Sequence, residues 1–399
     1  MAKEFAFIKR SSHSTRTSDM QTQPKQSPSS EPEQRGIEFG LAASRDALDM
    51  ANFHNSHYGT RRRPEDWLWE YQTYEPGKTV FAFARDGDKL IATKANMPVH
   101  MKVGTECVLS GKGESVLMLP PYRGTTLLPS LDEYLVKNSI DRGMQFVWGL
   151  GPVTKVAQKL GSTCYPDVQV WLRPGNIWVN IVARLQTHPY GTPTPLWRRI
   201  SSVGKVILQS LFMRTGNSKT IPQIQELAGY EIKKGEIDER CLQELLGRVT
   251  SEHSNIISLT YDQKYLRWRV REHPFLKYDE YQVHQGGKLR ACAFVVLSQG
   301  FASISDFLSE DRHATSLLLH TILKDYAKKA GRFRFLGNPR DVLLQDVFDQ
   351  LLQFGFSVDE KTRESWNLNV KDLTGGKYEQ IFDIGNWHVS GLCTEGFLY

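Results

Sequence analysis

The fold of this chain is decided by the stretch Ser115-Val116-Leu117-Met118-Leu119-Pro120-Pro121-Tyr122-Arg123-Gly124-Thr125-Thr126-Leu127-Leu128, where a short apolar strand passes through a small-residue turn into a helix. Amides at a helix N-terminus point outward with the positive end of the dipole, so such a turn can wrap a pyrophosphate. Arg123 would supply charge, and Thr125 and Thr126 hydroxyl donors. Gly124 lets the backbone approach the ligand. Because Thr is also a good helix cap, a purely structural turn remains an alternative.

The elements around this stretch are repeated about 200 residues later. Trp67-Leu68-Trp69 precedes a strand-like run at 79–85, the turn Asp86-Gly87-Asp88 and Lys89-Leu90-Ile91-Ala92. The second copy has Tyr265-Leu266-Arg267-Trp268, an alternating run at 278–284, the turn Gly286-Gly287 and Lys288-Leu289-Arg290-Ala291. In both copies a later strand and a helix follow, from Gly143 and from Gly331. The repeat predicts two similar units in tandem.

The pattern of strands and helices predicts an α/β (α+β) protein in which each unit has a mixed, mostly antiparallel sheet flanked by helices. We expect a disordered tail at 1–36, a first unit at 37–186, a linker at 187–220 and a second unit at 221–399. Two strands, at 168–172 and 177–184, are expected to close the first unit.

The linker contains an apolar stripe with helical spacing at 196–214, including Trp197, Ile200 and Val203 among Arg198 and Arg199. Such a basic amphipathic helix is typical of contact with an anionic membrane surface. It is also typical of a connector packed between two domains, which is the commoner role of such a stripe, and the sequence leaves both readings open.

The composition limits the classes of protein to which this chain can belong. The chain of 399 residues is 40% hydrophobic, which is enough to bury two cores, and its net charge of +6 is not gathered into one tract, so we do not expect nucleic-acid binding. The five cysteines lie far apart with no metal-ligand spacing, which predicts reduced thiols and no metal. The N-terminus lacks the apolar core of a secretion signal, and no apolar run reaches the roughly 20 residues that span a bilayer. We therefore expect a cytoplasmic protein, with contact to the inner face of the membrane as an open possibility.

The order of these elements, with Arg-Gly opening the helix after the fourth strand, resembles the GNAT superfamily of acyl-CoA-dependent N-acyltransferases. Within it, the chain is most similar to tandem GNAT proteins found with bacterial exopolysaccharide and cell-envelope genes, over about residues 37–399. The matching stretches are Lys94-Ala95-Asn96-Met97-Pro98-Val99, Tyr122-Arg123-Gly124, Leu160-Gly161, Tyr265-Leu266-Arg267-Trp268-Arg269 with His273-Pro274, Gln353-Phe354-Gly355-Phe356, and Gly385-Asn386-Trp387.

The resemblance implies a donor site for acetyl-CoA or a longer acyl-CoA in the first unit. Its pyrophosphate would lie on the turn formed by Arg123, Gly124, Thr125, Thr126, Leu127 and Leu128, and its pantetheine between the strands at 115–119 and 144–149. Backbone amides near Met118 and Leu119 would polarise the thioester carbonyl while an amine attacks it. The family pattern is Arg-Gly-x-Gly-x-Gly or Ala, and here Thr126 and Leu128 replace the last two small residues. The sequence assigns no catalytic acid or base.

The second copy has no Arg-Gly turn, and Glu310 and Asp311 stand in the first turn of its helix, where they would repel a pyrophosphate. We expect this copy to help hold a small-molecule or glycan amine acceptor, such as an amino sugar of a polysaccharide or envelope precursor. The residues expected to line that site are Trp268, Arg269, Asp306, Asn338 and Trp387, although buried tryptophans are often core residues.

Two further interpretations are left open. A non-catalytic binding or scaffold protein of the same fold would explain the incomplete glycine pattern. A Fem-type transferase would use aminoacyl-tRNA as its donor, with which the modest positive charge is compatible.

Overall fold

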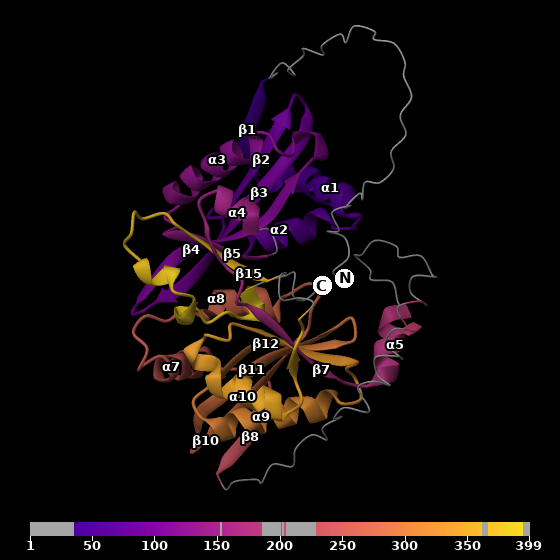
Figure 1. The fold of residues 1–399 in the computed structure, drawn as a ribbon, viewed down its shortest axis with the longest axis vertical. Helices are drawn as coiled ribbons and strands as arrows, with labels where there is room; N and C mark the ends of the chain where they lie inside the picture. The colour runs from indigo at the N-terminus through magenta and orange to yellow at the C-terminus, as the bar shows by residue number, and fades with distance from the viewer. Residues whose placement is uncertain are drawn as a thin grey trace, which may run out of the picture.

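The computed structural model describes residues 36–151, 154–185, 201, 203–204, 229–360 and 366–393. Two sheets with helices packed on them lie one above the other along the long axis (Figure 1). Most of the expected tail (1–36) and of the linker (187–220), including nearly all of the helix at 196–214, falls outside the described residues.

The first sheet has eight strands. Their order is β1-β2-β3-β4-β5-β15-β6, with β9 beside β3, and β4 and β5 run parallel while the other pairs are antiparallel. The strands are β1 Ile37–Leu41, β2 Val80–Asp86, β3 Lys89–Val103, β4 Glu106–Met118, β5 Phe146–Gly151, β6 Thr163–Tyr165, β9 Ile257–Leu259 and β15 Asn367–Asp372.

The second sheet has seven strands in the order β14-β7-β13-β12-β11-β10-β8. Here β12 and β13 are the parallel pair, so the pairing pattern of the first sheet is repeated. The strands are β7 Gln169–Pro174, β8 Tyr230–Lys234, β10 Tyr278–Gln285, β11 Lys288–Ser298, β12 Phe301–Ser309, β13 Arg332–Gly337 and β14 Ser357–Val358. The prediction of two mixed, mostly antiparallel sheets flanked by helices is confirmed.

Corresponding helices flank the two sheets. The helix after the fourth strand of the first unit, α3 Leu127–Asp141, has its counterpart in α9 Arg312–Tyr326, and each packs on its own sheet. The other α-helices of the described residues are α1 Ala47–Tyr58, α2 Pro64–Gln72, α4 Thr154–Lys159, α5 Ile177–Leu185, α7 Glu239–Val249, α8 Gln263–Leu266 and α10 Gln345–Gln353. Short helical turns are η1 Ser44–Asp46, η2 Pro120–Tyr122, η3 Arg267–Arg271, η4 Val342–Leu344, η5 Glu379–Phe382, η6 Ile384–Asn386 and η7 Gly391–Cys393.

The two halves of the chain exchange a strand. β15, which follows β14 in sequence, lies between β5 and β6 in the first sheet. In return β7 pairs with β13 and β14 in the second sheet. In the first sheet, the strand next to β5 therefore comes from the second half of the chain. In the second sheet, the strand next to β13 comes from the first half.

The sequence prediction for residues 168–184 was only partly right. A strand does form at Gln169–Pro174, but it belongs to the second sheet, and the residues expected as a strand at 177–184 form α5 instead. Asn176 explains the helix start, because its Oδ1 accepts the amides of Trp178 at 3.0 Å and Val179 at 3.4 Å. These bonds satisfy amides that a new helix leaves without partners.

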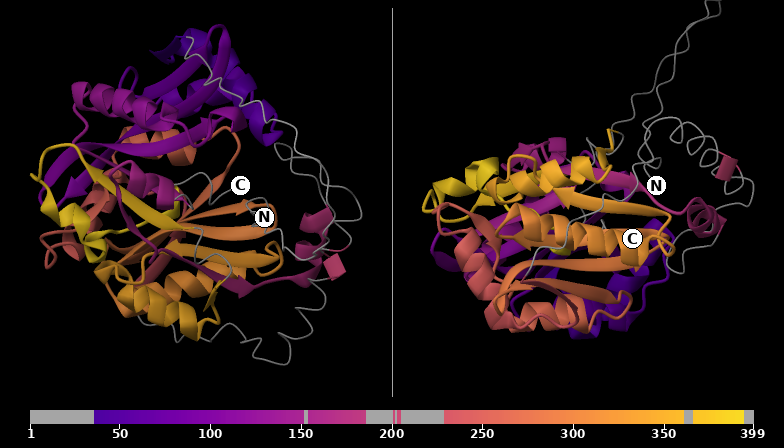
Figure 2. Two further views of the ribbon diagram at one scale, coloured as in Figure 1. Left: turned by 45° about the horizontal axis from the view of Figure 1, so that its top comes forward. Right: turned by 90° about the horizontal axis from the view of Figure 1, so that it is seen from below.

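Aromatic side chains fill the contact between the halves. Trp268 stacks on Tyr74 with ring centroids 5.2 Å apart, and its Nε1 donates to the carbonyl of Trp69 at 3.0 Å. Trp387 contacts the rings of Phe146 and Trp148 on β5. In the left view of Figure 2 the C-terminal segment after β15, in yellow, runs along the junction of the two units. One of the hydrophobic core clusters thus contains residues from both halves.

Candidate functional site

The predicted donor turn lies where β4 passes through η2 into α3. Gly124 has φ +84° and open space where a Cβ would stand, as the close backbone approach requires. The Thr125 hydroxyl donates to the carbonyl of Tyr122 at 2.7 Å and accepts the amide of Leu127 at 3.2 Å. Thr125 therefore satisfies the first amide of α3, whose N-cap residue is Thr126. Among the described residues, the amides of Gly124, Thr126 and Leu128 make no hydrogen bond, and they remain available at the helix N-terminus.

Arg123 is exposed beside this turn. Its Nε donates to the carbonyl of Met118 at 3.1 Å, and its guanidinium lies 3.4 Å from Nε2 of His57 on α1. Burial, and then the charge of Arg123, lower the pKa of His57 below its ordinary value. His57 is therefore neutral near pH 7, and the positive charge of the site is carried by Arg123.

The edge of β4 next to β5 is only partly paired. The two strands pair at Gly111 with Val147 and at Lys112 with Trp148, and the edge of β4 from there to Met118 has no strand partner among the described residues. In the same region β4 bulges against β3, and Ser115 has φ +50°. The Ser115 hydroxyl lies 2.6 Å from that of Tyr71 on α2. A bulge bends a strand and increases its twist, which accounts for the divergence from β5.

The two amides expected to polarise an acyl carbonyl differ in availability. The amide of Leu119 donates to the carbonyl of Ile91 on β3 at 2.9 Å. Because successive residues of a strand direct their backbone groups to opposite sides, the Met118 amide faces the unpaired side. Met118 is therefore the free donor of the pair, and Leu119 is already engaged in the sheet.

Two groups that the sequence reasoning did not single out lie at the start of this unpaired edge. Lys112 is 3% exposed, and its ammonium is ion-paired with the carboxylate of Glu114. Residues two apart on a strand share a face, so the Lys-x-Glu spacing was the available signal. Glu114 is the carboxylate that the unpaired part of β4 itself carries, and it is partly open to solvent.

The corresponding region of the second unit is filled by the protein's own chain. β12 pairs with β13 from Phe301 to Ile304 and then diverges. Beyond this point Ser390 donates to the carbonyl of Ser305 at 3.2 Å. At the start of α9 the Asp311 carboxylate accepts the amide of Ala314 at 2.8 Å, so a carboxylate already occupies that helix N-terminus. The unit that lacks the Arg-Gly turn is therefore also the unit in which the corresponding region is already occupied by groups of the protein itself.

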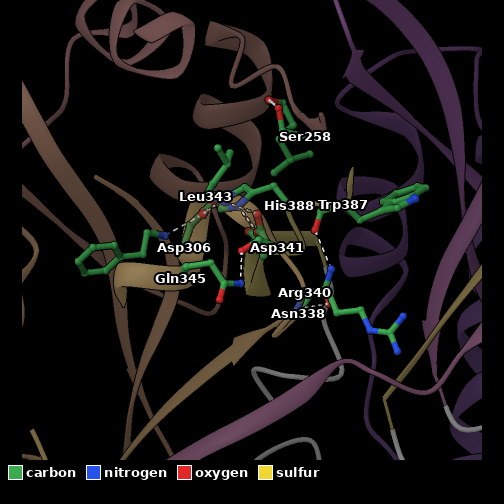
Figure 3. Close-up of polar contacts among 12 residues, drawn as sticks. Ser258, Asp306, Asn338, Arg340, Asp341, Leu343, Gln345, Trp387 and His388 are labelled. Carbon is green, nitrogen blue, oxygen red and sulfur yellow. Dashed lines mark hydrogen bonds and ion pairs between the residues drawn. The ribbon is translucent and has the colours of Figure 1, made fainter. Parts of the chain in front are cut away.

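A buried ionic cluster holds the C-terminal segment there (Figure 3). Nε2 of His388 lies 3.3 Å from Oδ1 of Asp306 on β12, and its Nδ1 lies 2.7 Å from Oδ2 of Asp341. The hydroxyl of Tyr261 donates to Asp306 at 2.7 Å. Burial lowers the pKa of His388, but the carboxylates of Asp341 and Asp306 outweigh it and raise the pKa to about 10. The cluster is therefore an imidazolium held between two carboxylates.

The five residues expected to hold an acceptor are all buried and take part in packing. Asn338 donates to the carbonyls of Ile384 at 2.6 Å and Trp387 at 3.1 Å, and Arg269 donates to that of Leu392 at 3.0 Å. The others lie in the contacts between the halves and in the ionic cluster, as described above for Trp268, Trp387 and Asp306. Their role toward an acceptor stays a prediction.

The described residues contain no helix long and apolar enough to cross a membrane and no cluster of three or more His, Cys, Asp or Glu suited to a metal ion. None of the five cysteines is in a disulfide.

No family model and no curated protein sequence matches the chain. Solved structures do match it. A protein of Enterococcus faecalis described as a probable N-acyltransferase has a TM-score of 0.58 at 8% identity, covering 85% of this chain and 73% of that chain. A GCN5-related N-acetyltransferase of Anabaena variabilis has a TM-score of 0.55 at 11% identity, with 84% and 73% covered. N-myristoyltransferase of Saccharomyces cerevisiae with bound myristoyl-CoA has a TM-score of 0.53 at 15% identity, with 88% and 83% covered. The chain therefore has the fold of the GCN5-related N-acetyltransferases, as the resemblance in sequence predicted.

Proposed function

We propose that this protein is an acyl-CoA-dependent N-acyltransferase with one donor site, in its first unit. The observation that carries the proposal is the unpaired edge of β4, which ends at Met118 beside the open N-terminus of α3. An extended pantetheine arm has amides that can pair with such an edge, and a pyrophosphate suits the amides and dipole at the helix start.

In this proposal the amine nitrogen of the acceptor attacks the thioester carbonyl carbon. The Met118 amide donates to the oxyanion as it forms. Collapse of the tetrahedral intermediate breaks the C–S bond, and the thiolate of CoA leaves and takes up a proton. Glu114 is the group we assign to accept the proton that the attacking amine loses, since its carboxylate stands at the start of the same edge.

The acceptor is the finer part of the proposal. We propose a small-molecule or glycan amine, such as an amino sugar of a polysaccharide or envelope precursor, acylated in the cytoplasm, with the segment at 196–214 able to contact a membrane. The basic amphipathic sequence of that segment supports the membrane contact. The blocked second unit supports a single donor site, because its helix N-terminus is capped by Asp311.

Calorimetric titration with acetyl-CoA and with a longer acyl-CoA tests the donor site. The wild type should bind one of them with micromolar affinity, and Arg123→Glu should weaken binding about ten-fold or more, because it places a carboxylate beside the pyrophosphate. Arg240→Glu is the matched control, since Arg240 is 88% exposed on α7. Wild-type protein that binds neither compound would favour a scaffold protein. RNA binding that falls steeply with salt would favour a tRNA-dependent transferase.

Transfer itself is tested by release of free thiol from the acyl-CoA that binds. A panel of amino sugars and simple amines should contain one that raises the rate of thiol release above that of the donor alone. If binding is tight but no amine does so, the donor site stands and the acceptor class proposed here is wrong.

A further inference from the structure

Strand β8 forms one end of the second sheet. It pairs with β10 on one side, and within the described residues no strand pairs with its other edge. Figure 1 shows β8 at the foot of the molecule, away from the junction with the first unit. Residues 231–234 are exposed. An open edge of this kind presents amides and carbonyls that can pair with a strand of another chain.

The pairing with β10 shows which backbone groups of β8 point outward. Lys234 lies opposite Tyr281, and the amide of the next residue, Gly235, donates to the carbonyl of Glu280 at 2.9 Å. Along an antiparallel pair, residues that exchange hydrogen bonds with the neighbouring strand alternate with residues that do not. Counted back from Gly235, the alternation leaves every second residue of β8 with its amide and carbonyl on the open side, namely Tyr230, Ile232 and Lys234.

The side chains of β8 suit a second copy of the same strand. In an antiparallel pair centred on Ile232, the outward amide and carbonyl of Ile232 meet those of Ile232 in the other copy, as a two-fold axis requires. Glu231 then faces Lys233, and opposite charges in directly opposed positions attract. The side chain of Ile232, which is 41% exposed, would lie against its own copy.

Neighbouring registers lose this agreement. A pair centred on Glu231 would place two glutamates opposite each other, and one centred on Lys233 would place two lysines there. Both would also bring together residues whose backbone groups are already bonded to β10. Charges on an edge strand commonly prevent pairing with other chains. On β8 the alternation of sign instead makes the register centred on Ile232 attractive.

The charges of β8 are free to change partners at little cost. Within one chain Nζ of Lys233 lies 3.5 Å from Oε2 of Glu231, and these side chains are 57% and 69% exposed. An ion pair as exposed as this one contributes little to stability, so exchanging it for a pair between two copies is not opposed. Lys234 is already ion-paired with Asp279 at 2.8 Å, so its charge is balanced within the chain.

We propose that two copies of this protein pair antiparallel through β8, about a two-fold axis at Ile232. The second sheets of the two copies then form one continuous sheet. The partner that fits this edge is therefore a second copy of the chain. The proposal goes beyond the transferase activity proposed above and does not depend on it, because β8 belongs to the unit that lacks the proposed donor site.

The test is sedimentation of the full-length protein over a range of concentrations, where we expect a reversible dimer. Glu231→Lys should weaken the dimer about ten-fold or more, because it places lysines opposite each other on both sides of the axis. Lys233→Glu should do the same with glutamates. The double variant Glu231→Lys with Lys233→Glu should restore the dimer, and an equimolar mixture of the two single variants should form a mixed dimer. Because both side chains are exposed, all variants should keep the thermal midpoint of the monomer.

The matched control is Glu38→Lys, which reverses an exposed charge on β1, an end strand of the first sheet. It should leave the dimer unchanged. A wild type that stays monomeric up to about 100 μM would overturn the proposal. A dimer that both single variants leave intact would also overturn it, as would a dimer that they abolish and that neither the double variant nor the mixture restores. Acyl-CoA binding is measured separately, so either proposal can fail without the other.

Discussion

Nδ1 of His388 lies 2.7 Å from Oδ2 of Asp341, and both side chains are almost completely buried. His388 belongs to the C-terminal segment, whereas Asp341 precedes η4 of the second unit. The contact therefore ties the end of the described chain into the region where β12 and β13 diverge.

The stability of this cluster should depend on pH. The pKa of His388 is about 10 in the folded protein against an ordinary value of 6.5, so the folded state holds the proton more tightly. The stabilisation is fully present below pH 6.5 and is lost as the pH rises toward 10. In urea titrations over that interval, the difference in unfolding free energy between wild type and His388→Gln should be largest at the low end and shrink steadily. His253→Gln, at a half-buried histidine outside the cluster, is the control. Parallel curves for wild type and His388→Gln would contradict a charged His388.

Trp268→Ala should lower the free energy of unfolding by about 3–5 kcal/mol, because it removes a large buried ring from the contact with Trp69 and Tyr74. Chemical denaturation measures this loss, and Trp178→Ala, at an exposed site, should stay within about 0.5 kcal/mol of wild type. A variant at Trp268 that kept its stability but raised the KM for an amine would instead assign this residue to the acceptor.

Gly331→Ala should destabilise the protein by about 1–3 kcal/mol, since the added methyl group meets the backbone of Asn180 and must displace α5. Gly247→Ala is a control that should change the free energy of unfolding in the opposite direction. Gly247 lies inside α7 with open space at its Cβ position, so alanine there should stabilise by roughly 0.5–1 kcal/mol. Equal thermal midpoints for the two variants would mean that α5 is not seated as described.

Glu114→Gln should remove acyl transfer and also cost about 1–3 kcal/mol of stability, because the buried ammonium of Lys112 loses its ion-pair partner. The double variant Lys112→Met with Glu114→Gln separates the two effects, since it removes both charges. It should regain most of the stability in a thermal melt and still fail to transfer the acyl group. Recovery of transfer along with stability would show that Glu114 acts only through packing.

The repeat in the sequence was sufficient to predict the two sheets and their flanking helices. Period-two runs, glycine turns and apolar helix faces are local signals, and Gly87 with Gly286 and Gly287 does turn the two hairpins at positive φ. The turn between β4 and α3 was likewise predicted in its place, whereas its role as a donor site stays a prediction. The bulge at Ser115 was not predicted, because no local pattern marks the register against β3.

The exchange of β7 and β15 could not be predicted from the sequence, for a physical reason. Alternation of apolar residues shows that a strand forms, but it does not show which sheet offers the free edge. The prediction of a strand at 177–184 was wrong, since these residues lie in α5, where Asn176 accepts the amide of Trp178 at the start of the helix. The partner of Asp306 could not be inferred either, since His388 lies 82 residues away in the chain. The tryptophans at 268 and 387 show the same limit, because an aromatic residue can serve in a core or in a ligand contact and is more often found in a core.

The exchanged strands also constrain how the protein can be synthesised and inherited. When the ribosome has made residues up to β6, the first sheet still lacks the strand that separates β5 from β6, because β15 follows all the strands of the second sheet in the chain. The first sheet therefore closes only after the strands of the second sheet have been synthesised. A nonsense mutation before residue 367 would remove β15, an internal strand of the first sheet. This loss would occur even though the other strands of that sheet, except β9, all precede the linker. Recombination that shuffled either half alone would leave both sheets incomplete, so the two copies are inherited as one folding unit.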